Sequence, residues 1–234
     1  MTMRQMVSAA CGLWIGLAGA VLAQTRPVVV ELYTSQGCSS CPPADAFMAT
    51  LAQQPDVIAL SLHVDYWDYI GWRDTFAQPQ YTQRQKAYAK AVGSRMIYTP
   101  QMIVAGNDRI VGNDPAEVAA SIRRHQATPS AVRLTLTRHG DTLTIRAEAD
   151  PPLTEAARVQ LVRYVPQATI EIGRGENQGR NVTYTNIVTS WQALDDWPGT
   201  SPLEVQAEVK GEDPVVVIVQ SQGPAEVLAA AQLK

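Results

Sequence analysis

The sequence is poor in the residues that bind metals or nucleic acids. It has three cysteines, three histidines and a formal net charge of −3 among 234 residues. A structural zinc site needs about four nitrogen or sulfur ligands close together, and His63, His125 and His139 are scattered along the chain. A nucleic-acid-binding protein usually carries a basic stripe, which this sequence lacks. We therefore expect no metal, no cofactor and no nucleic-acid partner.

Long hydrophobic runs are also missing beyond the N-terminus. Residues 7–22 form a short run rich in Gly and Ala, Arg4 precedes it, and Val21-Leu22-Ala23 resembles the site that a signal peptidase cleaves. We predict a signal peptide over residues 1–23 and hence an exported protein, periplasmic or secreted, with no membrane contact after cleavage. A retained membrane anchor is the alternative, although the run is short for a bilayer span.

Cleavage would remove Cys11 and leave a single pair, Cys38 and Cys41, separated by two serines. Export would place this pair in a compartment where disulfides persist. A bond between such close cysteines closes a very small loop and therefore stabilises the fold little. The spacing favours a redox role over a structural one.

Residues 24–128 show alternating strand and helix patterns. Apolar, β-branched runs predict strands at 28–33, 57–64, 101–105 and 109–112. Helical spacing predicts a helix that begins between Cys38 and Pro42, another over 81–92, and a third from Asp114, with Asp114 as N-cap. The order β-α-β-α-β-β-α is the connectivity of the thioredoxin fold, so we predict an α/β, thioredoxin-like domain over 24–128.

Residues 129–234 show a different pattern, in which apolar and polar residues alternate. A hairpin turns at His139-Gly140-Asp141, and further strand-like runs lie at 158–165, 168–172, 181–190, 203–210 and 215–220. About seven short strands predict a small all-β, sandwich-like domain. We expect the segment 224–234 to be a short helix.

The cysteine pair follows a strand and opens a helix. Free N–H groups and the positive end of the helix dipole stabilise a thiolate at this position and lower its pKa. We expect Cys38, on the loop side, to be the exposed nucleophile and Cys41, one turn into the helix, to be the buried resolving thiol. Exchange would then pass through a mixed disulfide on Cys38.

The segment from Glu31 to Asp45, ELYTSQGCSSCPPAD, resembles a secreted bacterial family catalogued as domain of unknown function 1223, as do residues 63–67, 98–101 and 175–180. The order of elements around the cysteines resembles the thioredoxin superfamily. That resemblance implies a cis bond between Thr99 and Pro100 beside the cysteines, with the Thr99 backbone available to an extended substrate. Unlike classical thioredoxins, the chain has Gly37 rather than Trp before Cys38.

Two polar residues in apolar strands are further candidates. Glu31 precedes the cysteines, and thioredoxins carry a buried acid at a similar place that accepts the proton of the second thiol. Burial would raise the pKa of Glu31 as that role requires; an acid with a salt-bridge partner is the alternative. His63 ends the next strand, and we favour a hydrogen-bonded core histidine over a metal ligand.

The aromatic segment and one polar loop complete the set. Trp67, Tyr69 and Trp72 either line a substrate groove or cover the core, and we favour the core for most of them. The Gly-rich loop 175–180 lacks the strand-to-helix setting of a phosphate loop. We expect it to form a turn or an interdomain contact.

These observations favour an exported thiol–disulfide oxidoreductase that acts on protein or small-molecule thiols and disulfides, together with an unidentified redox partner. One alternative is a thioredoxin-like binding module whose disulfide takes no part in catalysis. Another is a copper-handling protein that uses Cys38, Cys41 and His63.

Overall fold

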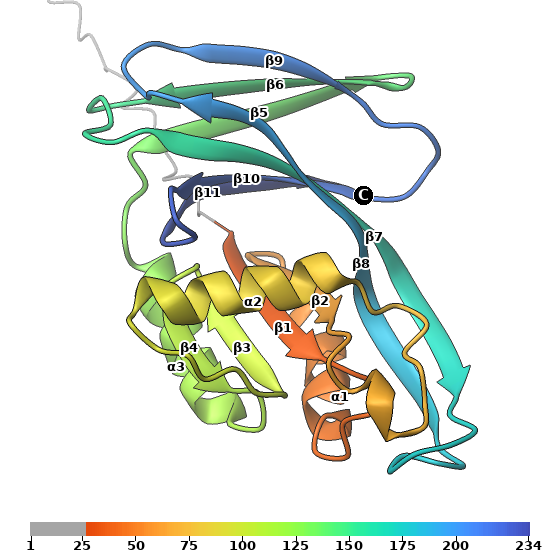
Figure 1. The fold of residues 1–234 in the computed structure, drawn as a ribbon. Coiled ribbons are helices and arrows are strands. Elements are labelled where there is room, and N and C mark those ends of the chain that lie inside the picture. The colour runs from red at the N-terminus through yellow and green to blue at the C-terminus, as the bar shows by residue number, and fades with distance from the viewer. Residues whose placement is uncertain (1–26) are drawn as a thin grey trace, which may run out of the picture.

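The computed structural model describes residues 27–234, so the predicted signal peptide lies outside the described residues. The fold is mixed α/β, with an eight-stranded sheet, a second sheet of three strands, and helices packed on the large sheet (Figure 1). The strand order is β11-β10-β7-β8-β2-β1-β3-β4 in the large sheet and β5-β6-β9 in the small one.

The first half of the chain has the predicted order of elements. They are β1 (Val28–Thr34), α1 (Pro42–Leu51), β2 (Val57–His63), the 3₁₀ helix η1 (Asp68–Ile70), α2 (Pro79–Ala91), β3 (Gln101–Val104), β4 (Asp108–Val111) and α3 (Pro115–Gln126). Strand β1 pairs in parallel with β2 and antiparallel with β3. The Asp114 side chain accepts a hydrogen bond from the Glu117 N–H, so the predicted N-cap is confirmed.

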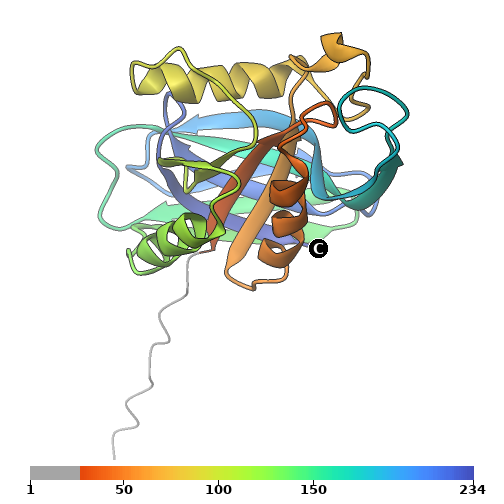
Figure 2. The same ribbon diagram turned by 90° about the horizontal axis from the view of Figure 1, so that it is seen from below.

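Helices α1 and α3 lie on one face of β1–β4, and α2 lies on the other (Figure 2). Side chains of a strand alternate between the two faces of a sheet. Leu32 accordingly packs with the α1 and α3 residues, whereas Tyr33 packs with α2. The same alternation directs Glu31 to the α2 face and Thr34 to the α1 face.

The second half contains seven strands, the predicted number, although they are not all the predicted ones. They are β5 (Val132–His139), β6 (Thr142–Ala149), β7 (Ala157–Glu171), β8 (Asn181–Trp197), β9 (Leu203–Glu208), β10 (Val215–Ser221) and β11 (Val227–Leu233). They do not form a separate sandwich. Strands β7, β8, β10 and β11 extend the large sheet, and β8 lies beside β2 through Ser61 and Ile187.

The large sheet is shared by the two halves of the chain, which explains why the second half forms no separate sandwich. In β10, Val216 and Ile218 pack towards the α2 side, while Val215, Val217 and Val219 pack against the three-stranded sheet. A strand buried on both faces is continuously apolar, and such a strand does not reveal which element covers each face. The sandwich layers are therefore β5-β6-β9 and part of the large sheet.

Two predicted elements of the second half are wrong in detail. The runs at 158–165 and 168–172 form one strand, β7, of 15 residues, and β8 has 17. The segment predicted as a terminal helix forms strand β11, which pairs antiparallel with β10. Pairing and burial along a sheet outweigh the helix propensity of Ala229, Ala230 and Ala231.

The length of β7 and β8 matters for the site. These strands of the large sheet extend beyond the three-stranded sheet and carry the loop between them to the end of the molecule where β1 meets α1 (Figure 1). Within residues 27–234, no helix is long and apolar enough to cross a membrane.

Candidate functional site

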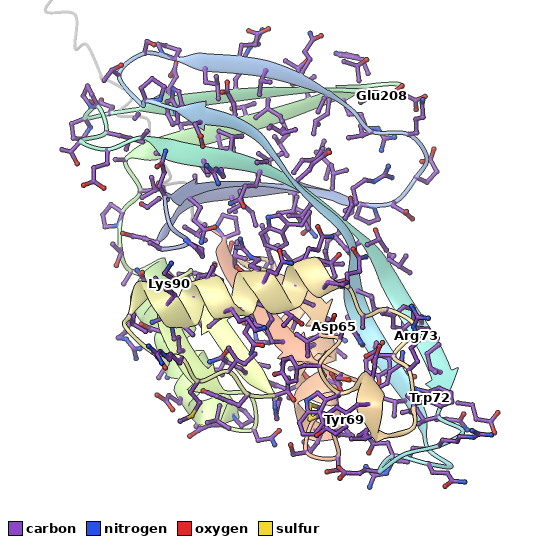
Figure 3. The ribbon with its side chains drawn as sticks, in the orientation of Figure 1. Asp65, Tyr69, Trp72, Arg73, Lys90 and Glu208 are labelled. Atoms are coloured by element: carbon purple, nitrogen blue, oxygen red, sulfur yellow. A yellow bond between two sulfur atoms is a disulfide. The ribbon has the colours of Figure 1, made fainter. Side chains whose placement is uncertain are left out.

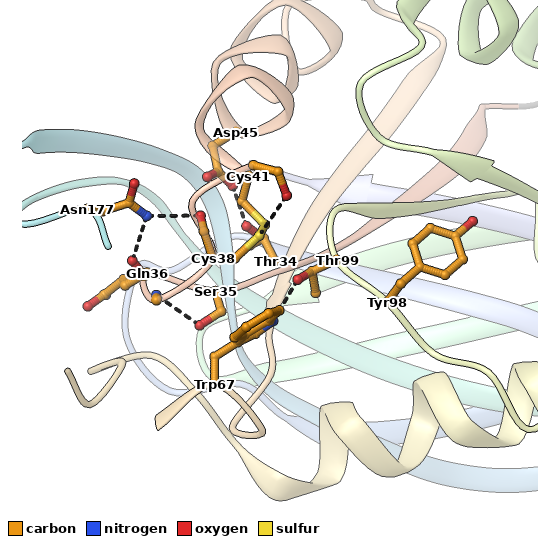
Figure 4. The surroundings of a disulfide bond; sticks show 12 residues. Thr34, Ser35, Gln36, Cys38, Cys41, Asp45, Trp67, Tyr98, Thr99 and Asn177 are labelled. Atoms are coloured by element: carbon orange, nitrogen blue, oxygen red, sulfur yellow. Dashed lines mark hydrogen bonds between the residues drawn. A yellow bond between two sulfur atoms is a disulfide. The ribbon is translucent and has the colours of Figure 1, made fainter. Parts of the chain in front are cut away.

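A disulfide joins Cys38 and Cys41 in the turn between β1 and α1 (Figure 4). The Cα atoms are 5.4 Å apart, and Cys41 is the N-cap residue of α1. Pro42 and Pro43 follow at the first helical positions, where a missing N–H costs no helical hydrogen bond. The predicted strand–CxxC–helix arrangement is confirmed.

The turn before Cys38 packs closely against the aromatic segment. A Cβ added at Gly37 would lie 3.2 Å from both the Ile70 Cδ1 and the Trp67 Cβ. A larger residue here, such as the Trp of classical thioredoxins, would require Ile70 and Trp67 to shift. Trp67 and Trp72 are partly buried against the core, as we expected for most of this segment, whereas Tyr69 is 80% exposed. In Figure 3, Trp72 lies towards the tip of β7 and β8.

The loop between β7 and β8 holds the same turn from the other side. Asn177 is 1% exposed, and its Nδ2 donates to the carbonyl oxygens of Gln36 and Cys38, both at 2.9 Å (Figure 4). The expectation of a contact between the two halves of the chain is confirmed. The second half thus contributes a residue directly to the cysteine turn.

The close packing around the cysteine turn contradicts the prediction about the exposure of Cys38. Cys38 is 1% exposed and Cys41 is fully buried, so the expectation of an exposed Cys38 is wrong for the disulfide form. Residues from two distant segments cover the turn, and a local pattern could not reveal either. Ser39 and Ser40 between the cysteines are exposed, and the Ser40 Oγ lies 3.5 Å from the Cys38 Sγ.

Pro100 is joined to Thr99 by a cis peptide bond, as the family resemblance implied. It lies beside α1, because a Cβ at Gly112 would come within 2.9 Å of the Pro100 Cβ and 3.1 Å of the Ala44 Cβ. The Thr99 hydroxyl accepts a hydrogen bond of 2.7 Å from the Trp67 indole. The structure therefore brings this predicted pair to the aromatic segment that covers the cysteine turn.

Glu31 does not face the cysteines. Its two oxygens accept hydrogen bonds from Arg84 at 2.7 Å and from the hydroxyls of Tyr88 and Tyr33 at 2.7 and 2.9 Å. Burial opposes the Arg84 charge, but Glu31 outweighs that effect and holds the pKa of Arg84 above its usual value. The salt-bridge alternative describes Glu31, and a proton-accepting role does not agree with these contacts.

Asp45 is a buried acid that does lie beside the cysteines. It follows Cys41 by one helical turn, its N–H donates to the Cys41 carbonyl at 3.0 Å, and Figure 4 places its carboxyl next to the disulfide. The Thr34 hydroxyl donates to Oδ1 at 2.7 Å, whereas Oδ2 is buried without a partner. Burial, opposed by nearby His63 and Thr34, raises the pKa of Asp45 to about 7.

His63 is fully buried near Asp45. Its Nδ1 lies 2.7 Å from the Asp74 Oδ2, and its ring packs edge-on against Phe76 and Tyr184. Burial opposes the Asp74 charge, but His63 and hydrogen bonds from two backbone N–H groups hold the pKa of Asp74 below its usual value. The prediction of a hydrogen-bonded core histidine is confirmed.

Three residues of this site were missed by sequence reasoning: Asp45, Asp74 and Asn177. Asp45 carried a usable signal, because Cys41, Ala44, Met48 and Leu51 make an apolar helical stripe to which position 45 also belongs. Asp74 carried none, since it reaches the site only through the folded chain. Asn177 belongs to the loop 175–180, for which an interdomain contact was one expectation, but no local signal distinguished this residue from its neighbours. Within residues 27–234, no group of three or more His, Cys, Asp or Glu side chains could hold a metal ion.

Two solved structures are similar in fold to this chain. A crystal structure of an Agrobacterium tumefaciens protein from a structural genomics programme is 32% identical, covers 88% of this chain and 93% of its own, and superposes with a TM-score of 0.76. HBP35 of Porphyromonas gingivalis is 15% identical, with coverage of 89% and 75% and a TM-score of 0.64, and so shares the fold alone. No curated protein matches.

The family model described as "Protein of unknown function (DUF1223)" matches residues 29–220, which include the cysteine turn, the Thr99–Pro100 pair and the β7–β8 loop. The chain belongs to this family.

Proposed function

We propose that the chain is a thioredoxin-like thiol–disulfide oxidoreductase that uses the Cys38–Cys41 pair. One observation carries the proposal: a half-partnered, buried Asp45 beside the second cysteine of a disulfide at a helix N-terminus. The sheet order β2-β1-β3-β4, with α1 and α3 on one face and α2 on the other, supports the thioredoxin-like assignment. The cis-proline beside α1 supports it as well.

The chemistry requires a proton acceptor at Cys41. In the reduced protein the Cys38 thiolate attacks a substrate disulfide, forms a mixed disulfide and releases one substrate thiolate. Cys41 then gives its proton to Asp45 and attacks the Cys38 sulfur, which closes the protein disulfide and releases the second substrate thiolate. An acceptor with a pKa near 7 is well matched to this transfer at neutral pH. The reverse sequence oxidises a substrate dithiol.

The surface near the site supports protein substrates in addition to small thiols. Tyr69 of η1 and Val111, the neighbour of Gly112, are 80% and 51% exposed. Their segments contact the cysteine turn and Pro100 respectively. Exposed apolar side chains around a reactive centre favour a partly unfolded or extended polypeptide, whose own apolar groups they can bury.

An exchange assay tests the proposal. The purified chain, starting at Gln24, is incubated with insulin and dithiothreitol, and separately with a reduced, unfolded protein. We expect turnover above that of free dithiothreitol, its loss in Cys38→Ser, trapped mixed disulfides in Cys41→Ser, and normal rates in the control His139→Gln at an exposed position on β5. A wild-type rate equal to that of free dithiothreitol would leave the non-catalytic binding module as the better description.

The copper alternative separates from this proposal in the same protein. Stoichiometric Cu(I) binding that is lost in His63→Ala would favour copper handling. We further propose export, on the basis of the N-terminal pattern; fractionation of cells and N-terminal sequencing of the mature chain test it. A cytoplasmic chain that retains Met1 would contradict it.

A further inference from the structure

One acid and one base near the cysteine turn each have a buried polar atom without a hydrogen-bond partner. These atoms are the Asp45 Oδ2 and the His63 Nε2. A buried polar atom without a hydrogen bond typically costs about 1–3 kcal/mol. Because such atoms are rare in folded proteins, each calls for a reason. One belongs to an acid and the other to a base, which suggests that they serve the same proton.

The orientation of His63 is set by its other nitrogen. Asp74 accepts from Nδ1 through Oδ2, and the same oxygen accepts from the backbone N–H of Gln36 at 2.8 Å. Gln36 lies two residues before Cys38, so Asp74 ties the histidine to the cysteine turn. With Nδ1 held by a carboxylate, a gained or lost proton must be exchanged at Nε2.

The buried charges of this site affect one another. Asp45 comes from α1, His63 from β2 and Asp74 from the segment after η1; His63 lowers the pKa of Asp45 and Asp74 raises it. Tyr184 of β8 responds to both acids. The Asp68 Oδ1 accepts from the Asp74 N–H, and Asp68 is in turn influenced by Asp65 and Arg73. Electrostatic coupling in a buried site is strong because little water screens it.

We infer that His63, held by Asp74, exchanges a proton with Asp45 and thereby positions and recharges the acceptor that serves Cys41. Thr34, whose hydroxyl holds Asp45, is the register partner of His63 across the parallel strands β1 and β2, so both side chains lie on the α1 face of the sheet. The transfer would join the His63 Nε2 and the Asp45 Oδ2 directly or through one bound water. This inference rests on the proposed exchange reaction. His63 acts through Asp45 and is a positioning residue rather than a catalytic one.

The proton balance closes in both directions. When Cys41 closes the disulfide, Asp45 takes its proton and shares it with the His63 Nε2, while the two substrate thiolates take up two protons from solvent. When a substrate dithiol is oxidised, Cys41 leaves as a thiolate and takes the shared proton back through Asp45, and the two substrate thiols release their protons to solvent.

The pH dependence of mixed-disulfide resolution tests this relay. In the wild type we expect the rate to rise with pH through a midpoint near 7. In His63→Gln the midpoint should move to higher pH, because a positive neighbour that favours the Asp45 carboxylate is gone, and the rate at pH 7 should fall about tenfold. His139→Gln, at an exposed position on β5, is the matched control and should behave as wild type. An unchanged midpoint in His63→Gln overturns the relay.

A second measurement does not depend on how the variant folds. Nitrogen NMR of the wild-type imidazoles should show the His63 Nε2 signal changing with the titration of Asp45 and again on reduction of the disulfide. A constant signal overturns the relay. Exchange no faster than free dithiothreitol overturns the proposed function, whereas normal exchange with an unchanged His63→Gln midpoint and a constant signal overturns the relay alone.

Discussion

Two buried acids lie on opposite faces of the sheet at strand β1 and differ in their partners. Glu31, on the α2 face, meets Arg84 and two tyrosine hydroxyls, which occupy both of its oxygens. Asp45, on the α1 face, has one hydroxyl partner, and its second oxygen has none. Burial is nearly complete in both cases. The two acids therefore differ in their partners and not in their burial: only Asp45 keeps a carboxylate oxygen without a hydrogen bond.

The second half of the chain closes both sites. Gln220 of β10 accepts from Arg84 on the Glu31 side, and the Arg84 guanidinium lies 3.8 Å from the centre of the Trp191 ring. On the Asp45 side, Asn177 holds the cysteine turn. The Glu31 site is filled with matched charges, whereas the Asp45 site keeps polar atoms without partners near a disulfide. We interpret the Glu31 site as structural and the Asp45 site, called the chemical site below, as the place where thiol exchange would occur.

The largest effect should follow from breaking the structural site. Glu31→Ala leaves the Arg84 charge buried without its carboxylate, which should lower the free energy of unfolding by about 3–5 kcal/mol. Urea unfolding measures it. The double variant Glu31→Gln with Arg84→Met should recover much of the loss, because it leaves no unpaired charge. A Glu31→Gln protein with normal stability but slow exchange would contradict the structural reading.

Asp45→Asn should affect activity and pH-dependent stability together. Resolution of the mixed disulfide should slow by about 100-fold because the proton acceptor is lost. In the wild type the unfolded chain releases the Asp45 proton near pH 4 and the folded chain near pH 7, so stability falls as pH rises between these values. At pH 8 the resulting loss in the free energy of unfolding amounts to roughly 4 kcal/mol.

The variant should not show that fall and should therefore be more stable than wild type at pH 8. Urea unfolding of the oxidised proteins at pH 5 and pH 8 measures the difference. Equal pH dependence in both proteins would show that Asp45 titrates as an ordinary exposed acid.

Asn177→Ala should loosen the chemical site from the second half of the chain. Two hydrogen bonds to backbone carbonyls are lost, and we expect a decrease of about 2 kcal/mol in unfolding free energy together with faster attack of thiols on the now more open Cys38. Hydrogen exchange of the amides near residue 38 and the rate of reduction by glutathione measure these changes. Asn181→Ala, at an exposed site on β8, is the control. Unchanged reduction would mean that Asn177 does not limit access.

The smallest effect should come from Thr34→Val, which keeps the shape of the side chain and removes the one hydroxyl that holds Asp45. Because this hydrogen bond lowers the pKa of Asp45, its loss should move the midpoint of the rate profile to higher pH. The stability cost should be about 1 kcal/mol. A midpoint that moves to lower pH would contradict the role of the Thr34 hydroxyl in lowering the pKa of Asp45.

Local sequence signals carried the prediction of the first half well. The apolar runs, Asp114 with Pro115, and the strand–CxxC–helix order all correspond to elements of the structure, because they depend on short-range pattern and capping. The second half was harder. The sequence of a strand such as β10, which is apolar on both faces, does not specify what covers each face. The cover can be another sheet of a small sandwich or a helix of the first half.

The prediction of Glu31 as the acid beside the cysteines shows the same limit of local sequence signals. Glu31 was the natural candidate because it interrupts an apolar strand next to the cysteines. The face towards which it points, and the arrival of Arg84 from α2, depend on how the sheet and helix pack. Asp45 could have been found from the helical stripe after Cys41, since one turn of helix is a local relation.

By itself, then, the sequence determined that a single CxxC pair opens a helix after a buried strand, because strand, turn and helix signals are local. Only the tertiary structure decided that Cys38 is covered, that Asp45 rather than Glu31 is the acid beside the pair, and that Asn177 closes the turn. The covering of Cys38 and the contact of Asn177 depend on residues far apart in the chain, which meet only when the two halves pack into one sheet. The orientation of Glu31 away from the pair depends on how Arg84 of α2 packs against it.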